Sequence, residues 1–382
     1  MILTPESFGA IGDGKHLDGH SFYRLITFVN NIGGSEAVHI QCRGRYLITG
    51  GPNLDYPFGS KKELGKVRGL LPILRENVHI DAKEAIFHVP RTFHWRRTKR
   101  GGDKNDHFAC GWHFIGSNCS MTGGTMNGNL ANRTVIRGPK MSNFGGQEFG
   151  LIMQGLNWKL TGVVSKNWGT DCLNIGAPGV AVGCDFIGGR RNSVSVVPRL
   201  RVLGRKERVI IEGCRMHGGG DWPDRIRNRP GAGLDIEGIG NEIEARVTVT
   251  KCNFHGNKEK DLQVSRNAVD CIVQDCKFSN DIKFQPEQKG GHVLIGNTFN
   301  DESTIKTIYG QKSNKIIVFV DNHFECEKKP PFRQRVIKSL QKRLQGQRVY
   351  FYKNSAINWI GTFAMLPIFK KGSHFIENCT KK

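Results

Sequence analysis

The chain lacks the long apolar runs of a membrane protein. No stretch of about 18 apolar residues occurs among its 382 residues, so we expect no transmembrane helix and no membrane partner. The first residues also lack a basic region followed by an apolar core, so no signal peptide is recognised. These features alone leave the compartment unknown.

Acidic residues are few compared with basic ones. Asp and Glu total 34 and Lys and Arg total 56, which gives a net charge of +22. The hydrophobic content of 38% and the 22 Phe residues exclude a disordered chain, which would combine high charge with low hydrophobicity. The positive charge predicts an anionic partner: nucleic acid, an acidic lipid surface or an acidic polysaccharide.

Signatures of cofactor and metal sites are also missing. The sequence has no Walker loop, HExxH, GxSxG or EF-hand pattern, so we expect no cofactor. Its eleven cysteines are odd in number, include no CxxC pair and have no His pair at zinc-finger spacing, so we expect no metal. Free, buried thiols are expected in place of disulfides.

The sequence does contain an internal repeat. Six segments place a Cys or Asn two residues before a Phe or Met, usually after a β-rich run, and alternation of this kind indicates a strand with both residues on one face. If the segments stack in register, these residues form a Cys/Asn ladder and an aromatic ladder. The first members of the six pairs are Cys184, Cys214, Cys252, Cys276, Asn297 and Asn322.

A second strand recurs between these segments, with one polar residue between two apolar ones. The polar residues are Asn174, Ser195, Asp235, Gln263 and Lys283. Coils of roughly 20–25 residues with two or three short strands each are typical of a parallel β-helix. The fold class predicted is therefore all-β, a single-stranded parallel β-helix.

The two ends of the chain differ from the repeats. Residues 19–31 have helical apolar spacing with Asp18 as a candidate N-cap, which predicts a helix that covers the open end of the solenoid. After Pro331, residues 333–344 fit a basic amphipathic helix, either a cap with a solvated basic face or a contact for nucleic acid or membrane. The apolar positions of the first helix are Phe22, Leu25, Ile26 and Val29.

We expect three regions along the chain. Residues 1–35 form the entry motif and capping helix, and residues 36–325 form the β-helix, with an insertion at 217–230. Residues 326–382 form a basic C-terminal cap or extension.

Several motifs resemble one known family. Residues 8–14 (Phe-Gly-Ala-Ile-Gly-Asp-Gly) and the strand at 38–48 resemble the entry motif of pectate-lyase-superfamily right-handed β-helices. Residues 121–128 resemble an early coil, and residues 233–237 (Gly-Leu-Asp-Ile-Glu) resemble a strand found in many such proteins. The resemblance covers roughly residues 7–325 and implies a right-handed helix. The calcium site of pectate lyases and the Asp triad of polygalacturonases are not matched.

The resemblance also implies a class of activity. Phage tailspike depolymerases, polygalacturonase-like hydrolases and bacterial exopolysaccharide enzymes belong to this family, so the expected partner is an acidic polysaccharide outside the cell or at a virion. Phage depolymerases of this type are often trimers, which makes a homotrimer an assembly to test. Nucleic acid is not expected as a partner, because solenoid coils offer no helix that reads a groove.

Two acids stand out in the repeated strand. Leu234 and Ile236 should point to the interior, so Asp235 and Glu237 should both point outward, with backbones about 6.6 Å apart. Their column neighbours are mostly small or polar, which predicts the floor of an open groove, with the insertion 217–230 as one wall. Two carboxylates near this spacing meet the needs of glycoside hydrolysis, in which proximity raises one pKa and creates a proton donor.

Further candidate residues surround this pair. Asp221 and Asp224 could supply the general acid or bind sugar hydroxyls, although Asp is also common in turns. Arginines would hold the carboxylates of an acidic sugar, and Trp222 could stack on a sugar ring. The candidate substrate contacts are Asp171, Asn174, Arg190, Arg191, His217, Trp222, Arg225, Arg227 and Gln263.

The first hypothesis is a depolymerase that hydrolyses an acidic bacterial exopolysaccharide or capsule with Asp235 and Glu237. The second is a lyase or uronate epimerase, in which Arg neutralises the uronate and His217, His255 or an Arg removes the C5 proton. The third is a non-enzymatic glycan-binding β-helix or virion structural protein. A buried Asp235 or Glu237, or the absence of a groove beside them, would favour the third.

Overall fold

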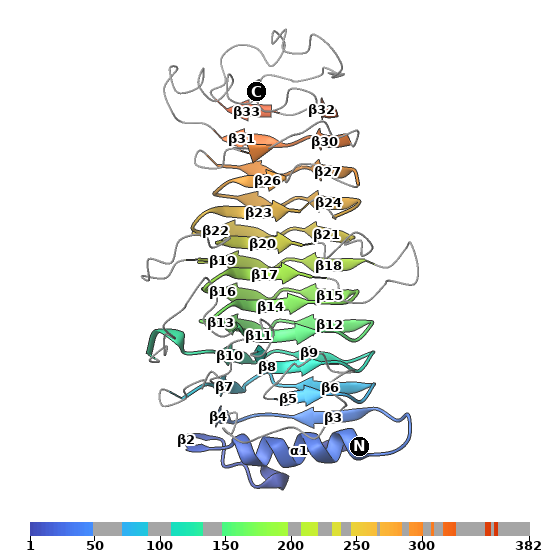
Figure 1. Cartoon of the computed structure of the whole chain (residues 1–382), viewed down its shortest axis with the longest axis vertical. Coiled ribbons are helices and arrows are strands. Elements are labelled where there is room, and N and C mark those ends of the chain that lie inside the picture. The colour runs from blue at the N-terminus through green and yellow to red at the C-terminus, as the bar shows by residue number, and fades with distance from the viewer. Residues whose placement is uncertain are drawn as a thin grey trace, which may run out of the picture.

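The protein is a tall stack of coils with one helix at its N-terminal end (Figure 1). The structure is a computed structural model. It describes residues 1–48, 71–90, 108–132, 147–197, 208–220, 231–237, 246–265, 268–284, 290–300, 307–308, 316–325, 348–352 and 355–357.

Three parallel sheets, here named A, B and C, run along the stack. Sheet A contains β1 (Ile2–Leu3), β3 (Val38–Gln41), β6 (Val78–Asp81), β9 (Ser120–Thr122), β12 (Trp158–Thr161), β15 (Gly179–Val182), β18 (Val209–Glu212), β21 (Val247–Thr250), β24 (Cys271–Gln274), β27 (His292–Ile295), β30 (Ile316–Val320) and β32 (Arg348–Tyr352). Sheet B contains β2 (Asp13–Leu17), β4 (Arg45–Leu47), β7 (Ile86–His88), β10 (Thr125–Asn127), β13 (Val164–Lys166), β16 (Asp185–Ile187), β19 (Arg215–His217), β22 (Asn253–His255), β25 (Lys277–Phe278), β28 (Thr298–Phe299), β31 (His323–Glu325) and β33 (Ser355–Ile357). Sheet C contains β5 (Leu71–Ile73), β8 (Phe108–Phe114), β11 (Gln147–Met153), β14 (Asp171–Ile175), β17 (Asn192–Val196), β20 (Ala232–Ile236), β23 (Lys260–Val264), β26 (Ile282–Phe284) and β29 (Thr307–Ile308).

This arrangement confirms the predicted right-handed parallel β-helix. Successive strands of each sheet come from successive coils, so every coil hydrogen-bonds to the coil before and after it. Sheets A and B continue through β32 and β33, beyond residue 325 where we expected the solenoid to end. The predicted helix at 333–344 lies outside the described residues. In the ranges that the structure covers, no helix is both long and apolar enough to cross a membrane.

The N-terminal helix covers the first coil, as predicted. Helix α1 (Gly19–Asn31) buries Phe22, whose ring meets three core aromatics edge-on. The centroid distances are 5.0 Å to Tyr46, 5.9 Å to Phe87 and 6.1 Å to Trp112. Two short 3₁₀ turns, η1 (Glu6–Phe8) and η2 (Leu130–Asn132), lie outside the sheets.

Asp18 occupies the N-cap position but does not cap the helix with its side chain. Its carboxylate accepts the backbone N–H of Ile11 at 2.8 Å, so the acid joins the entry loop to the helix start. Asp18 is thus the N-cap residue as predicted, while its carboxylate binds the entry loop and not the first turn of the helix.

The Cys/Asn ladder forms inside the coils as predicted. The backbone N–H of Cys184 donates to Cys214 Sγ at 3.3 Å, and that of Cys276 donates to Asn297 Oδ1 at 2.9 Å. The N–H of Asn297 in turn donates to Asn322 Oδ1 at 3.0 Å. All cysteines whose side chains the structure describes are free and buried, which confirms the expectation of unpaired thiols.

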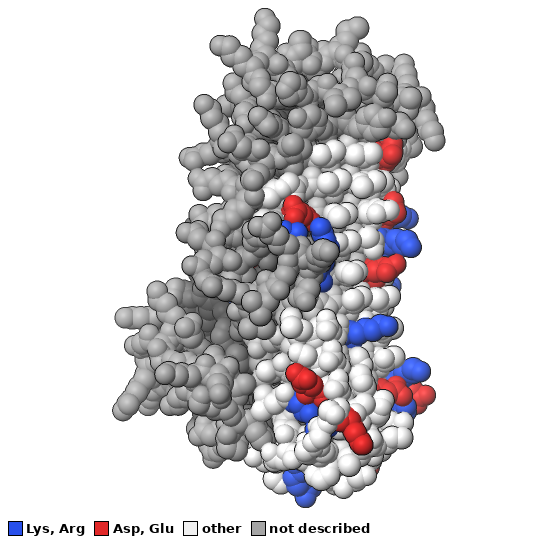
Figure 2. All heavy atoms as spheres, turned by 90° about the vertical axis from the view of Figure 1, so that its right-hand side faces the viewer, with Lys and Arg blue, Asp and Glu red and all other residues white. Residues whose placement is uncertain are grey.

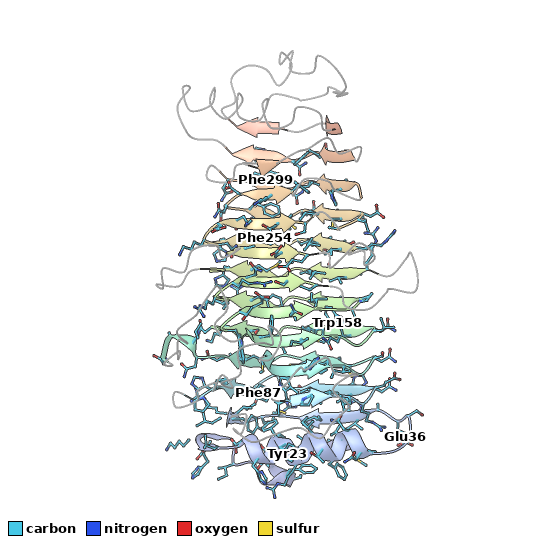
Figure 3. The ribbon with its side chains drawn as sticks, in the orientation of Figure 1. Tyr23, Glu36, Phe87, Trp158, Phe254 and Phe299 are labelled. Carbon is cyan, nitrogen blue, oxygen red and sulfur yellow. The ribbon has the colours of Figure 1, made fainter. Side chains whose placement is uncertain are left out.

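The aromatic ladder lies beside it. Phe254 stacks on Phe278 with ring centroids 4.8 Å apart, and Phe278 stacks on Phe299 at 5.2 Å. Phe87, Trp158, Phe254 and Phe299 mark successive levels of the stack (Figure 3). Stacked rings at identical positions of adjacent coils fill the core and penalise any slip of register.

We predict that Phe278→Ala lowers the free energy of unfolding by about 3–5 kcal/mol, because it removes a ring held between two others and leaves a cavity. Chemical denaturation followed by circular dichroism measures the loss. The exposed neighbour Lys277→Ala is the matched control and should change stability by less than about 0.5 kcal/mol. Equal effects of the two substitutions would contradict the ladder as a source of stability.

Candidate functional site

The candidate site lies on the outer face of sheet C, across the strands β14, β17, β20 and β23. The predicted column is confirmed by the register, which pairs its five polar residues in sequence. The order along the stack is Asn174, Ser195, Asp235, Gln263 and Lys283. Leu234 and Ile236 lie in the core, so Asp235 points away from the coil axis as expected.

Asp235 is nevertheless buried, with only 1% of its surface exposed. Its Oδ1 accepts Gln263 Nε2 at 2.8 Å, and its Oδ2 accepts Asn192 Nδ2 at 3.4 Å. Side chains from the coils on both sides therefore pack against the carboxyl group. The prediction of an acid exposed on the floor of an open groove is wrong for Asp235, because strand alternation determines which face a residue takes but not what packs against that face.

Burial raises the pKa of Asp235 well above its ordinary value, because the charged form loses its hydration. The charge of Glu237, and a hydrogen bond that the protonated Asp235 shares with Glu237, raise the pKa further. Arg191 and the Gln263 amide act in the opposite direction but do not cancel the effect. Burial and the neighbouring acid therefore both favour the protonated form of Asp235, which is the form that can donate a hydrogen bond to Glu237.

Glu237 is the accessible member of the pair, with 32% of its side chain exposed. Its Oε1 accepts Arg191 Nη2 at 2.8 Å. The same guanidinium lies 3.4 Å from Asp171 Oδ1, so Arg191 connects two acids of different coils. Glu237 and Arg191 therefore form the part of the cluster that can contact a ligand.

Asp171 and Asn174 are buried beside this clamp. Asp171 Oδ1 accepts the backbone N–H of Asn192 at 3.1 Å, whereas its Oδ2 has no hydrogen-bond partner. Asn174 Oδ1 is likewise unpartnered. Burial raises the pKa of Asp171, with partial compensation from Arg191. Buried acceptors without donors cost free energy, which favours the protonated form of Asp171.

Two members of the cluster were missed by sequence reasoning. Asn192 and Lys260 each stand three residues before a column member and hydrogen-bond to it. Asn192 Nδ2 donates to Ser195 Oγ at 3.0 Å, and Lys260 Nζ donates to Gln263 Oε1 at 2.8 Å. The polar residues three positions before Ser195 and Gln263 were the signal available, but strict alternation would have placed them on the opposite face.

The coil of Asp235 differs at this position. Ala232 occupies the place of Asn192 and Lys260 in the register, and its methyl group cannot donate a hydrogen bond. Asp235 therefore takes its donors from the adjacent coils. Gly233 on the same strand allows the next coil to pack closely, since a Cβ at that position would lie 2.8 Å from the backbone oxygen of Asp261.

Other predicted residues lie elsewhere. His217 is on the outer face of sheet B, where it stacks on His255 at 4.4 Å and lies 3.2 Å from Asp185 Oδ1. Arg190 is buried next to Arg191 in the chain, and its backbone N–H donates to Trp168 O. The predicted Asp221, Trp222, Asp224, Arg225 and Arg227 lie outside the described residues.

Charged side chains of both signs are mixed on the described surface. On the face shown in Figure 2, acidic and basic side chains lie side by side along one edge of the stack. Within the described ranges, no group of three or more His, Cys, Asp or Glu side chains is arranged to hold a metal ion. The acid cluster around Arg191 is thus the feature with the clearest chemical capacity.

Comparisons with known proteins agree on the fold. No protein-family model matches the sequence, and no curated protein matches it. Among solved structures, PfbA, a surface adhesin of Streptococcus pneumoniae, is similar with a TM-score of 0.55 and 12% identity, over 93% of this chain and 85% of that chain. The A-module of the mannuronan C-5 epimerase AlgE4 of Azotobacter vinelandii has a TM-score of 0.44 at 15% identity, over 84% and 95% of the two chains. An endo-xylogalacturonan hydrolase of Aspergillus tubingensis has 0.44 at 12%, over 94% and 86%. The resemblance to pectate-lyase-like right-handed β-helices is thus confirmed for the fold.

The raised pKa of Asp235 predicts a pH-dependent stability. Because the folded chain holds this proton more tightly than the unfolded chain, the contribution of Asp235 is full below its unfolded pKa and is lost as pH rises through the folded value. Asn mimics the protonated acid, so Asp235→Asn should be more stable than wild type at high pH, by about 1–3 kcal/mol. The two proteins should converge at low pH.

Thermal unfolding across a pH series measures this difference. Asp275→Asn replaces an exposed acid and serves as the control, for which we expect no pH-dependent gain. A stability difference for Asp235→Asn that is constant with pH would refute the raised pKa.

Proposed function

We propose that the chain is a polysaccharide depolymerase that hydrolyses an acidic bacterial exopolysaccharide or capsule, outside the cell or at a virion. The observation that supports this proposal is the acid pair in sheet C. The buried Asp235 has a raised pKa, and beside it lies the partly exposed Glu237, which Arg191 contacts at 2.8 Å. Groups whose environments separate their proton affinities in this way are typical of acid–base sites.

In this proposal the two carboxyl groups take different roles from those first expected. Retaining glycosidases hold their carboxyl groups about 5–5.5 Å apart and inverting ones about 6.5–9.5 Å. Asp235 is buried and cannot face a sugar, so Asp235 and Glu237 do not stand on opposite sides of one glycosidic bond. Glu237 is the carboxylate that faces the sugar, and Asp235 holds it in place.

In this scheme Glu237 activates the attacking water or attacks the anomeric carbon itself. Two donors, Arg191 and the protonated Asp235, keep it oriented. The general acid that protonates the leaving oxygen comes from Asp221 or Asp224, the predicted acids of the insertion. Asp171 and Asn174 are buried like Asp235, so Asp171 helps to hold Arg191 in place and neither residue contacts the sugar directly.

The lyase or epimerase hypothesis has less support. It needs an arginine that is available for a uronate and a nearby base. Arg191 already contacts two carboxylates, and His217 lies on sheet B. Hydrolysis is therefore the preferred reaction.

A non-enzymatic glycan-binding protein is the second candidate. The specific observation in its favour is the burial of Asp235, because a buried acid at this position is expected to favour a non-enzymatic protein. PfbA, with a similar fold, is a surface adhesin. In that case the acid cluster would only stabilise the stacked coils and would take no part in a reaction.

We predict that Glu237→Gln lowers hydrolysis of a responsive polysaccharide by about 100-fold to 10,000-fold, the usual contribution of a catalytic carboxylate, while binding persists. A panel of acidic bacterial exopolysaccharides is screened for new reducing ends and for the ultraviolet absorbance of an unsaturated product. Hydrolysis gives the first signal without the second. Glu212→Gln, an exposed acid on sheet A, is the control and should retain activity.

Three outcomes would count against the proposal. Full activity of both Asp235→Asn and Glu237→Gln would remove the acid pair from the mechanism. An unsaturated product would establish a lyase. Tight glycan binding with no cleavage by the wild type would establish the binding protein.

A further inference from the structure

The hydrogen bonds around Asp235 form a chain that begins at a buried lysine. Lys260 is the first residue of β23, and only 8% of its side chain is exposed. Its Nζ donates to Gln263 Oε1 at 2.8 Å, and Gln263 Nε2 donates to Asp235 Oδ1 at 2.8 Å. Both bonds are buried, so water does not compete for them.

We propose that Lys260 is a positioning residue, whose ammonium group fixes the orientation of the Gln263 amide and thereby the way in which Asp235 is held. An ammonium group can only donate hydrogen bonds, so the amide must turn its oxygen toward Lys260. Its NH₂ group must then face Asp235. The donor-only chemistry of the lysine therefore determines which end of the Gln263 amide faces Asp235.

The orientation matters because an amide has two different ends. The NH₂ group stabilises the ionised carboxylate of Asp235, whereas the amide oxygen would accept a hydrogen bond from the protonated acid. A turned amide would therefore compete with Glu237 for the Asp235 proton. Lys260 keeps that proton available to Glu237. The catalytic consequence of this role rests on the proposed function, whereas its effect on the pKa of Asp235 is measured independently of any activity.

The sequence of the adjacent coils explains why Lys260 is needed. Where Asn192 precedes Ser195, the donor is a neutral amide that can itself turn, and the hydroxyl it meets both donates and accepts. Ala232 offers Asp235 no donor from its own coil. The amide of Gln263 is thus the closest donor to Asp235 among the described side chains, and a donor-only neighbour is what fixes its direction.

Several charged groups surround this chain and act on the same proton. Glu237 lies on the coil of Asp235, and Arg191 lies on the coil before it, in contact with Asp171. Glu259 Oε2 is 3.6 Å from Lys260 Nζ. Lys283 follows Gln263 in the column. Burial of Lys260 is the main cause that lowers its pKa, and the charge of Lys283 lowers it further. A test must therefore separate the orienting effect of Lys260 from its direct charge.

A double-mutant cycle makes this separation. The pKa of Asp235 is measured by carbon-13 NMR of carboxyl-labelled protein, with the signal assigned by its loss in Asp235→Asn. We expect Lys260→Met to raise this pKa by about one unit, a tenfold change in proton affinity, in the wild-type background. In the Gln263→Leu background, where no amide remains to be oriented, the same substitution should shift the pKa by less than half as much.

Lys260→Arg is the conservative variant, since its guanidinium also only donates, and it should keep the pKa near that of wild type. Thermal unfolding of each variant confirms that it is folded, and the arginine variant supplies the comparison if Lys260→Met does not fold. Equal shifts in the two backgrounds would show a direct charge effect and overturn the inference, as would the absence of any shift.

The catalytic readout is kept separate from this physical one. In an active enzyme, Lys260→Met should move the pH–rate profile in the same direction as the Asp235 pKa, with a larger change in kcat than in KM. If no polysaccharide is cleaved, the proposed function fails and the NMR cycle still decides the inference. If cleavage depends on Glu237 but the cycle shows no coupling, the proposed function stands and Lys260 is not its positioning residue.

Discussion

In-register pairing between coils is the constraint on which the rest of this structure depends. Parallel strands of adjacent coils lie about 4.8 Å apart, so each side chain meets its counterparts directly above and below. A shift by one residue would turn every apolar side chain outward. The thiol and amide ladder and the stacked rings of Phe254, Phe278 and Phe299 satisfy this constraint inside the solenoid. Both ladders make register slips costly along the whole stack.

The same constraint concentrates polar groups on the outside. Because Asp235 is followed in its column by Gln263 and preceded by Ser195, its side chain has no space to spread into solvent. Acids at neighbouring positions are brought close in surroundings with little water, where their repulsion is strong. A single guanidinium, Arg191, contacts two of the three acids. The cluster accommodates the excess of acids by holding a proton, and this makes its chemistry sensitive to pH.

The sequence predicted the columns of this fold but not the environment of each member. The spacing of Cys252 and Phe254 and of their counterparts identified the coils, because period-two alternation is a backbone property. Burial of Asp235 depends on the long side chains of other coils, and alternation says nothing of these. Sequence reasoning missed Asn192 and Lys260 because strict alternation places a residue three positions before an outward one on the opposite face. The register between β20 and β23 passes from the pair Ala232–Lys260 directly to the pair Leu234–Leu262, so the strands are irregular just before the outward residues. Function was therefore hardest to predict at the positions where side chains depart from the period-two alternation of a strand.

The division between a buried and an exposed acid has a consequence for catalysis. An acid that is 1% exposed cannot reach a sugar, but it can set the orientation and charge of a neighbour that does. Glu237 gains from Asp235 a hydrogen bond in surroundings with little water, where such bonds are stronger than at the surface. Such a fixed, charge-assisted bond lowers the reorganisation needed when charge develops at the sugar. The burial that argues against Asp235 as a direct participant is thus the same property that would make Glu237 an effective one.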